Sequence, residues 1–171
     1  INPANNVLKG YVKVEASLPE HWNLLRDLPL GISSKKVKGG AALTFVKPNF
    51  IYAFKGNKTT EFYRYDISTG NWEKMADIPY ALEKRKPVGN GGSLTSDLER
   101  YVYAIKGNNT LEFWRYDVIN NQWERLPDVP LGEKRIKDGS GIVYVKKGDS
   151  SLVYLLKGSK TNEFYAYYVE G

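Results

Sequence analysis

The sequence predicts an all-β protein assembled from a repeated unit of about fifty residues. Residues 51–57 return as residues 102–108 and again as residues 153–159, an offset of 51 residues on both occasions. Aromatic side chains form 13% of the 171 residues and are accompanied by 16 Gly and 8 Pro, a composition typical of short strands separated by turns. No stretch keeps an apolar period of 3.6 residues across three helical turns, so the pattern does not predict helices.

The repeat extends well beyond this first segment. Residues 59–66 correspond to residues 110–117, and the third copy continues at residues 161–168. A tryptophan followed by an Asp-x-Pro tail also recurs in register, at Trp22, Trp72 and Trp123. Chance does not produce so many matched positions, and the sequence therefore indicates a repeat architecture.

One unit divides into four expected strands. An apolar run after Gly39-Gly40 suits a buried strand, and the turn at Gly56-Asn57 ends the second strand. The third strand alternates with the period of two that is expected of a half-buried strand, and a Ser-Thr-Gly-Asn turn separates it from the fourth. The four strands are expected at residues 41–46, 50–55, 61–67 and 72–76.

Four strands in about fifty residues match one blade of a β-propeller, and this unit resembles a kelch repeat. The resemblance is carried by residues 51–53 before the glycine turn, by Tyr65-Asp66 and by Trp72, with the same elements in the second copy. The chain departs from the kelch pattern at the usual Gly-Gly doublet, which is Lys-Gly in all three copies. The resemblance covers nearly the whole chain and implies about three propeller blades.

The resemblance predicts one propeller segment, residues 1–171, with an incomplete ring. Its parts are an N-terminal outer strand that completes another blade at 1–29, blades at 40–79 and 91–130, and a blade without its outer strand at 140–171. The outer strand is expected at residues 21–25, and residues 11–14 are expected to be the remnant of a third strand.

Closed propellers contain four to eight blades, so two explanations of the missing blades stay open. Two copies of the chain can join head to tail as a homodimer with six blades, in which each Trp22 strand completes the last blade of the other copy. Alternatively, the chain is a segment of a larger propeller whose other blades lie in another chain or have been removed.

The residues do not predict a catalytic, metal or cofactor site. The chain has no Cys and one histidine, His21, so disulfides, His-based metal clusters and His-paired catalytic triads are excluded within one chain. A tryptophan and a carboxylate recur in the units, and residues that obey the repeat are expected to hold turns and blade cores. These structural positions are Trp22, Trp72, Trp123, Glu61, Glu112 and Glu163.

The connections between the expected blades are rich in basic residues. The chain carries a net charge of +6, and nine of its 25 basic residues lie in these connections. They are Lys35, Lys36, Lys38, Lys84, Arg85, Lys86, Lys134, Arg135 and Lys137. In propeller geometry the loops between second and third strands share the same face. Those loops carry Lys55, Lys58, Lys106, Lys157 and Lys160. The sequence therefore predicts a basic rim around the channel mouth on one face, although lysine-rich loops also serve solubility alone.

These features favour a non-catalytic recognition or scaffold module that presents its basic face to a protein or an acidic glycan. Nucleic acid is not expected, because aromatic residues do not alternate with the lysines. A structural subunit of a larger assembly and a fragment of a carbohydrate-active enzyme are the alternatives. The sequence resembles kelch-type arrays of secreted or surface-attached bacterial proteins, and this resemblance implies an extracellular or cell-surface location. No apolar run in the sequence is long enough to span a membrane.

Overall fold

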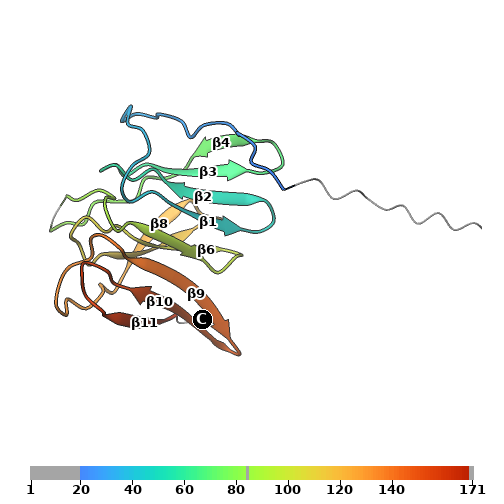
Figure 1. The fold of residues 1–171 in the computed structure, drawn as a ribbon. Helices are drawn as coiled ribbons and strands as arrows, with labels where there is room; N and C mark the ends of the chain where they lie inside the picture. The colour runs from blue at the N-terminus through green and yellow to red at the C-terminus, as the bar shows by residue number, and fades with distance from the viewer. Residues whose placement is uncertain (1–19, 84, 170–171) are drawn as a thin grey trace, which may run out of the picture.

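The computed structural model describes residues 20–83 and 85–169, and its eleven strands form three antiparallel sheets without a helix among these residues (Figure 1). The first sheet contains β1 (Ala42–Val46), β2 (Phe50–Phe54), β3 (Phe62–Asp66) and β4 (Asn71–Lys74). The second contains β5 (Ser93–Ser96), β6 (Tyr101–Ile105), β7 (Phe113–Asp117) and β8 (Gln122–Leu126). The third contains β9 (Gly141–Lys147), β10 (Ser150–Leu156) and β11 (Phe164–Val169). The all-β prediction is confirmed, and the strands of the first sheet begin and end within two residues of their expected positions.

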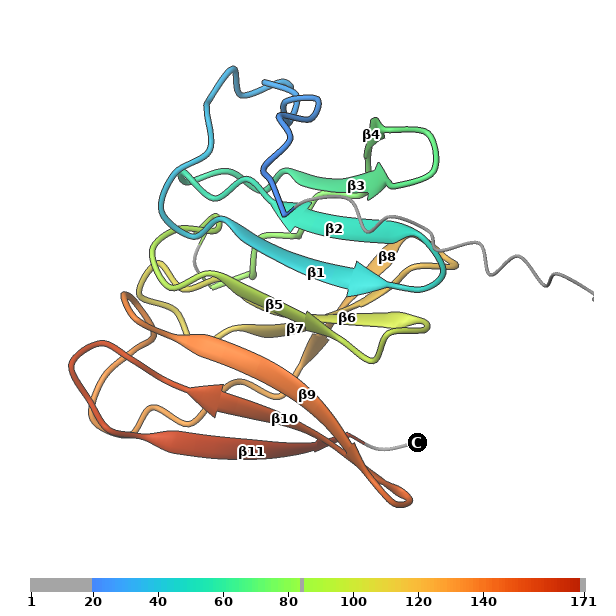
Figure 2. The ribbon, with the colours of Figure 1, turned by 45° about the vertical axis from the view of Figure 1, so that its right-hand side comes forward.

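The three sheets lie side by side, each with its strands in chain order (Figure 2). The first strands of the sheets are neighbours, because β5 contacts β1 on one side and β9 on the other. The hydroxyl of Thr95 accepts a hydrogen bond from the Tyr144 amide at 2.9 Å, and the hydroxyl of Ser140 donates to the Gly91 carbonyl at 2.6 Å. Repeated sheets in this arrangement are compatible with part of a β-propeller.

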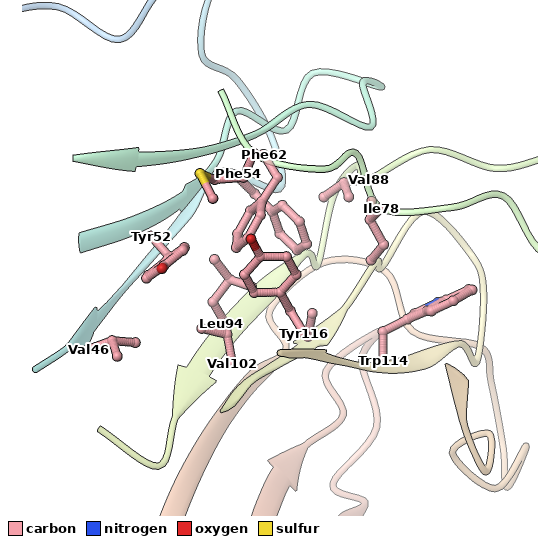
Figure 3. Close-up of a cluster of buried hydrophobic side chains, with 12 residues drawn as sticks. Val46, Tyr52, Phe54, Phe62, Ile78, Val88, Leu94, Val102, Trp114 and Tyr116 are labelled. Carbon is pink, nitrogen blue, oxygen red and sulfur yellow. The ribbon is translucent and has the colours of Figure 1, made fainter. Parts of the chain in front are cut away.

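An aromatic core joins the first sheet to the second (Figure 3). Phe62 of β3 lies 4.9 Å from the ring centre of Tyr116 and 4.9 Å from that of Trp123. The Trp123 ring also stacks on Phe54 at 5.9 Å, and its indole N–H donates to the Ala76 carbonyl at 2.9 Å. Trp123 therefore belongs to its own sheet through β8 and fills the space against the preceding sheet.

A second core joins the second sheet to the third. Ile105 and Phe113 are buried against Val153 and Leu155 of β10, and the Phe113 ring meets the edge of Tyr167 at 5.1 Å. The same positions of successive units thus pack the same way, since alternate residues of a strand face opposite sides of its sheet.

The segment before β1 follows the edge of the first sheet. Residues 20–30 form no strand, and the side chain of Trp22 is fully exposed. The Trp72 indole N–H donates to the Arg26 carbonyl at 3.0 Å, so the segment is joined to the first sheet a few residues after Trp22. The remnant strand predicted at residues 11–14 lies outside the described residues. The part of the chain that the structure describes contains no helix capable of spanning a membrane.

Candidate ligand-binding site

The connections between sheets gather on one side of the molecule, here called the loop face. It consists of residues 31–41, 75–83, 85–92 and 127–140, which precede the three sheets, and of the β2–β3, β6–β7 and β10–β11 loops. The β1–β2, β5–β6 and β9–β10 hairpins point to the opposite side (Figure 2). This division follows from antiparallel pairing, because each strand returns to the side from which its neighbour departed.

A left-handed turn anchors each basic connection. Gly56, Asn57 and Lys58 all have positive φ angles, of 66°, 51° and 56°, and a Cβ on Gly56 would lie 2.5 Å from the backbone nitrogen of Ala41. Asparagine tolerates this conformation better than most residues. The Asn57 amide also donates to the Lys36 carbonyl at 2.8 Å. The second and third units repeat this hydrogen bond. The Asn108 amide donates to the Pro87 carbonyl, and the Ser159 hydroxyl donates to the Arg135 carbonyl.

A cavity of about 460 Å³ lies where the turns of the first two units meet. Lys38 from the connection before β1 and Lys137 from the connection before β9 both line it, together with Lys58 of the β2–β3 loop. The other lining residues are Gly39, Gly89 and four asparagines, Asn57, Asn90, Asn108 and Asn109. The cavity therefore combines exposed ammonium groups with neutral amides that can both donate and accept hydrogen bonds.

The remaining residues of the predicted rim are distributed around this cavity. The Lys35 ammonium donates to the Lys58 carbonyl at 3.2 Å, and the Lys86 ammonium donates to the Asn108 carbonyl at 3.3 Å. Lys36 is exposed, and the Arg85 guanidinium lies 5.1 Å above the Tyr80 ring. Lys84 lies outside the described residues.

A neighbouring cavity of about 720 Å³ lies beside the third sheet. Lys134, Arg135 and Lys137 line it, and so do the two carboxylates Glu133 and Asp138. All five residues come from the same connection, in which the two acidic side chains flank the three basic ones.

Three lysines that the sequence assigned to the basic face are buried instead, and that assignment was wrong. Their exposed fractions are 1% for Lys55 and 0% for both Lys106 and Lys157. Each pairs with the glutamate six residues later in its loop. The distances from ammonium nitrogen to carboxylate oxygen are 2.8 Å for Lys55–Glu61, 2.7 Å for Lys106–Glu112 and 3.1 Å for Lys157–Glu163. Charged side chains are buried in proteins when they are paired in this way.

Each of these ion pairs also joins the loop to the tail of the preceding unit. The ammonium groups donate to backbone carbonyls of that tail, at Leu30, Pro79 and Pro130. Glu163 accepts from the Glu133 amide at 3.3 Å, and Glu112 accepts from the Trp114 indole at 3.0 Å. The signal for this arrangement was present in the sequence as the constant Lys–Glu spacing.

The surroundings of Glu61 hold the pKa of its carboxyl low, at about 2. Desolvation by burial acts in the opposite direction, but hydrogen bonds from Lys55, Ser33 and Tyr63 favour the ionised form more strongly. A carboxylate with several donors around it is the usual cause of such a shift.

Replacing Glu61 with glutamine is therefore expected to weaken the dependence of stability on pH. The ordinary pKa of a glutamate is 4.5. The ionised Glu61 stabilises the fold above that pH, and its contribution is lost as the pH falls through about 2. The difference in unfolding free energy between the original chain and E61Q should shrink from about pH 7 to about pH 2.5. Urea unfolding across this range measures it, and a difference that stays constant would contradict the prediction.

Among the residues that the structure describes, no group of three or more His, Cys, Asp and Glu side chains is placed to hold a metal ion. No known protein family matches the chain, and no curated protein shows significant similarity to it.

Proposed function

We propose that the chain is a non-catalytic recognition module of the kelch-like propeller type, and that its loop face binds an acidic glycan. The observation that carries this proposal is the cavity in which Lys38, Lys58 and Lys137 stand among four asparagines. Two observations support the kelch-like interpretation of the repeat. The three sheets have their strands in chain order, and each contains the same Lys–Glu ion pair in the loop between its second and third strands.

The chemistry of the cavity suits a charged sugar. Ammonium groups attract carboxylate or sulfate groups, and asparagine amides can both donate to and accept from sugar hydroxyls. The cavity lies at a junction of all three sheets, so a linear chain of acidic sugars can meet several lysines at once. A nucleic acid fits less well, since aromatic platforms for base stacking are missing from the residues that line this cavity. An extracellular or cell-surface location belongs to the same proposal.

Binding of polygalacturonate, compared with a neutral dextran of similar length, tests the proposal by isothermal titration calorimetry. The double variant K38Q/K137Q removes two cavity charges and should weaken polygalacturonate binding by roughly fivefold to thirtyfold, since each exposed charge contact is worth up to about 1 kcal/mol. Binding should also weaken as the salt concentration rises.

The matched control is K47Q/K147Q, which removes the same charge from exposed lysines at the hairpin ends of β1 and β9. This variant should bind polygalacturonate within about twofold of the original chain, as expected for surface changes away from the site. Equal losses in the two double variants would mean that net charge alone drives binding. Absence of polygalacturonate binding by the original chain would overturn the proposal.

A further inference from the structure

An apolar cavity of about 240 Å³ lies next to β11, between the second and third sheets. Ile105 and Phe113 of the second sheet line one side, and Val153, Tyr165 and Tyr167 of the third line the other. Strand β11 pairs with β10 along one edge, and its other edge is open in the described structure. An open edge exposes unpaired backbone groups that can pair with a further strand.

The corresponding place between the first and second sheets is occupied by Trp123. That residue stands opposite Tyr116 on β7, packs on Phe54 and Phe62, and donates to the Ala76 carbonyl. Moving each position forward by one repeat of 51 residues gives Tyr167 in place of Tyr116 and Pro127 in place of Ala76. It also gives Ile105 in place of Phe54 and Phe113 in place of Phe62. All four line the cavity, which therefore has the form of a receptacle for one more tryptophan strand.

Residues 22–25 have the sequence of such a strand. Aligned on the tryptophan, residues 22–25 agree with residues 72–75 and 123–126 at the first and fourth positions, which are Trp and then Leu or Met, whereas Asn23 and Leu24 replace charged residues. Trp22 and Leu24 are almost fully exposed, and Leu25 is largely exposed. Leu25 corresponds to Met75 and Leu126, which are buried, and fully burying a side chain of this size is worth about 1.5 to 3 kcal/mol.

The side chains that would face each other across the new pair are complementary. In the first two sheets an arginine of the third strand pairs with the glutamate after the tryptophan, as in Arg64–Glu73 and Arg115–Glu124. In the third sheet the arginine position is Ala166, and the residue after Trp22 is Asn23. Both charges of the ion pair are thus replaced together, so docking residues 22–25 on β11 leaves neither an arginine nor a glutamate without its partner.

The apolar pairing is matched as well. Phe113 stands opposite Leu126, and in the next unit the corresponding residues are Phe164 and Leu25. Phe164 is 64% exposed in the single chain, so Leu25 would cover it as Leu126 covers Phe113.

The two ends of the stack of sheets carry apolar faces that also correspond. On the outer face of the third sheet, Val143, Leu156, Phe164 and Tyr168 are exposed, and Leu43 is 64% exposed on the free face of the first sheet. Contiguous apolar surface of this kind marks an interaction site. Packing one end against the other repeats the contact already present between the first and second sheets, with Leu156 and Phe164 taking the places of Phe54 and Phe62.

A chain cannot bring its own Trp22 to its own third sheet. Arg26 is held at Trp72 on the first sheet, and the four Cα-to-Cα steps from Arg26 to Trp22 span at most about 14 Å. The third sheet lies beyond the second sheet, on the far side of the stack (Figure 2). Residues 22–25 of the same copy therefore cannot fill this cavity, whereas residues 22–25 of a second copy can.

We propose that two copies of the chain assemble head to tail into a closed ring of six sheets, in which residues 22–25 of each copy form the fourth strand of the other copy's third sheet. Trp22 fills the cavity beside β11, and its indole N–H donates to the Pro127 carbonyl. A contact between two different surfaces closes into a ring when the rotation per subunit allows it, and six blades lie within the range seen in propellers. The inference rests on the same repeat as the proposed function, but it does not depend on any ligand.

Engineered cysteines test the predicted register, because the chain has none of its own. Asn23 and Ala166 face each other in the proposed pair, and directly opposed residues have Cα atoms about 4.5 to 5.5 Å apart, within disulfide range. The variant N23C/A166C should oxidise to a covalent dimer of twice 19.4 kDa. In the off-register control N23C/Y168C, the two Cα atoms are about 7 to 8 Å apart, so little covalent dimer should form. A monomer of N23C/A166C, or a ladder of larger species, would overturn the closed ring.

Two further variants separate assembly from folding. Because Trp22 is fully exposed in the single chain, W22A should leave the far-ultraviolet circular dichroism unchanged. It should raise the dimer dissociation constant at least about tenfold, measured by light scattering. A166R places an arginine opposite Asn23 and should weaken the dimer, whereas A166R/N23E recreates the ion pair of the other sheets and should restore it. A monomeric original chain, or a W22A chain that dimerises as well as the original, would contradict the proposal while leaving polygalacturonate binding to be judged separately.

Discussion

Replacing Glu112 with glutamine is expected to lower the free energy of unfolding by about 3 kcal/mol at neutral pH. Lys106 is fully buried and its ammonium lies 2.7 Å from the Glu112 carboxylate. Removing one partner of a buried ion pair leaves an uncompensated charge in a poorly solvated place, which commonly costs several kcal/mol. Urea unfolding followed by tryptophan fluorescence measures the loss.

The dependence of this loss on pH identifies its cause. Burial already lowers the pKa of Lys106, and the hydrogen bond that its ammonium donates to Glu112 opposes that effect. Without the carboxylate the lysine pKa falls further, and the folded chain can then release the proton as the pH rises. A lysine with a lowered pKa in the folded state favours folding at high pH, so the difference between the original chain and E112Q should decrease from about pH 7 to about pH 10.

Two comparisons control for simple loss of packing. The double variant K106M/E112L replaces the whole pair with apolar side chains and should be more stable than E112Q, since no unpaired charge remains. E163Q should cost less than E112Q, because the Glu163 side chain is 15% exposed and that of Glu112 only 5%. If E112Q and K106M/E112L were equally destabilised, the unpaired charge would not be the reason for the loss.

The repeat predicted the strands well. The alternation of period two within a strand depends only on neighbouring residues, and the offset of 51 residues is visible when the copies are compared. Trp123 and Glu112 were assigned structural positions because they recur in the units, and Trp123 is half-buried in β8 while Glu112 is buried in the β6–β7 loop. The sides on which the loops emerge also follow from strand order alone. These features required no knowledge of contacts between units.

The features that sequence reasoning missed depend on contacts between distant segments. Lys106 lies in a turn, where lysines are usually solvated, and its burial arises because the tail at Pro79 covers it. The positions equivalent to Asn90 are Gly39 and Asp138, so the repeat does not mark this asparagine, and only the fold reveals that it shares a cavity with Lys38 and Lys137. The exposure of Trp22 could not be predicted from the sequence either. Trp22 shares its sequence motif with Trp72, but in the described part of the chain no sheet surrounds Trp22 as the first sheet surrounds Trp72.

Replacing Trp123 with alanine is expected to cost about 3 to 5 kcal/mol, the usual range for a large aromatic side chain removed from a core. The indole contacts Phe54 and Phe62 of the first sheet and Tyr116 of its own sheet. Its loss therefore opens a void between two sheets and leaves the Ala76 carbonyl without its donor. Thermal unfolding by calorimetry measures the loss, and W123F, which keeps most of the packing, should recover all but about 1 to 2 kcal/mol.

Trp72 is the matched comparison, because it occupies the same position in the first unit. It contacts Tyr65 at 5.0 Å and donates to the Arg26 carbonyl, but among the described residues of one chain no sheet precedes the first. In a monomer, W72A should therefore cost clearly less than W123A. In the proposed ring, Leu156 and Phe164 of the second copy pack on Trp72 as Phe54 and Phe62 pack on Trp123. The two costs should then converge as the protein concentration rises. Costs that stay unequal at concentrations where light scattering shows a full dimer would mean that the copies meet through some other surface.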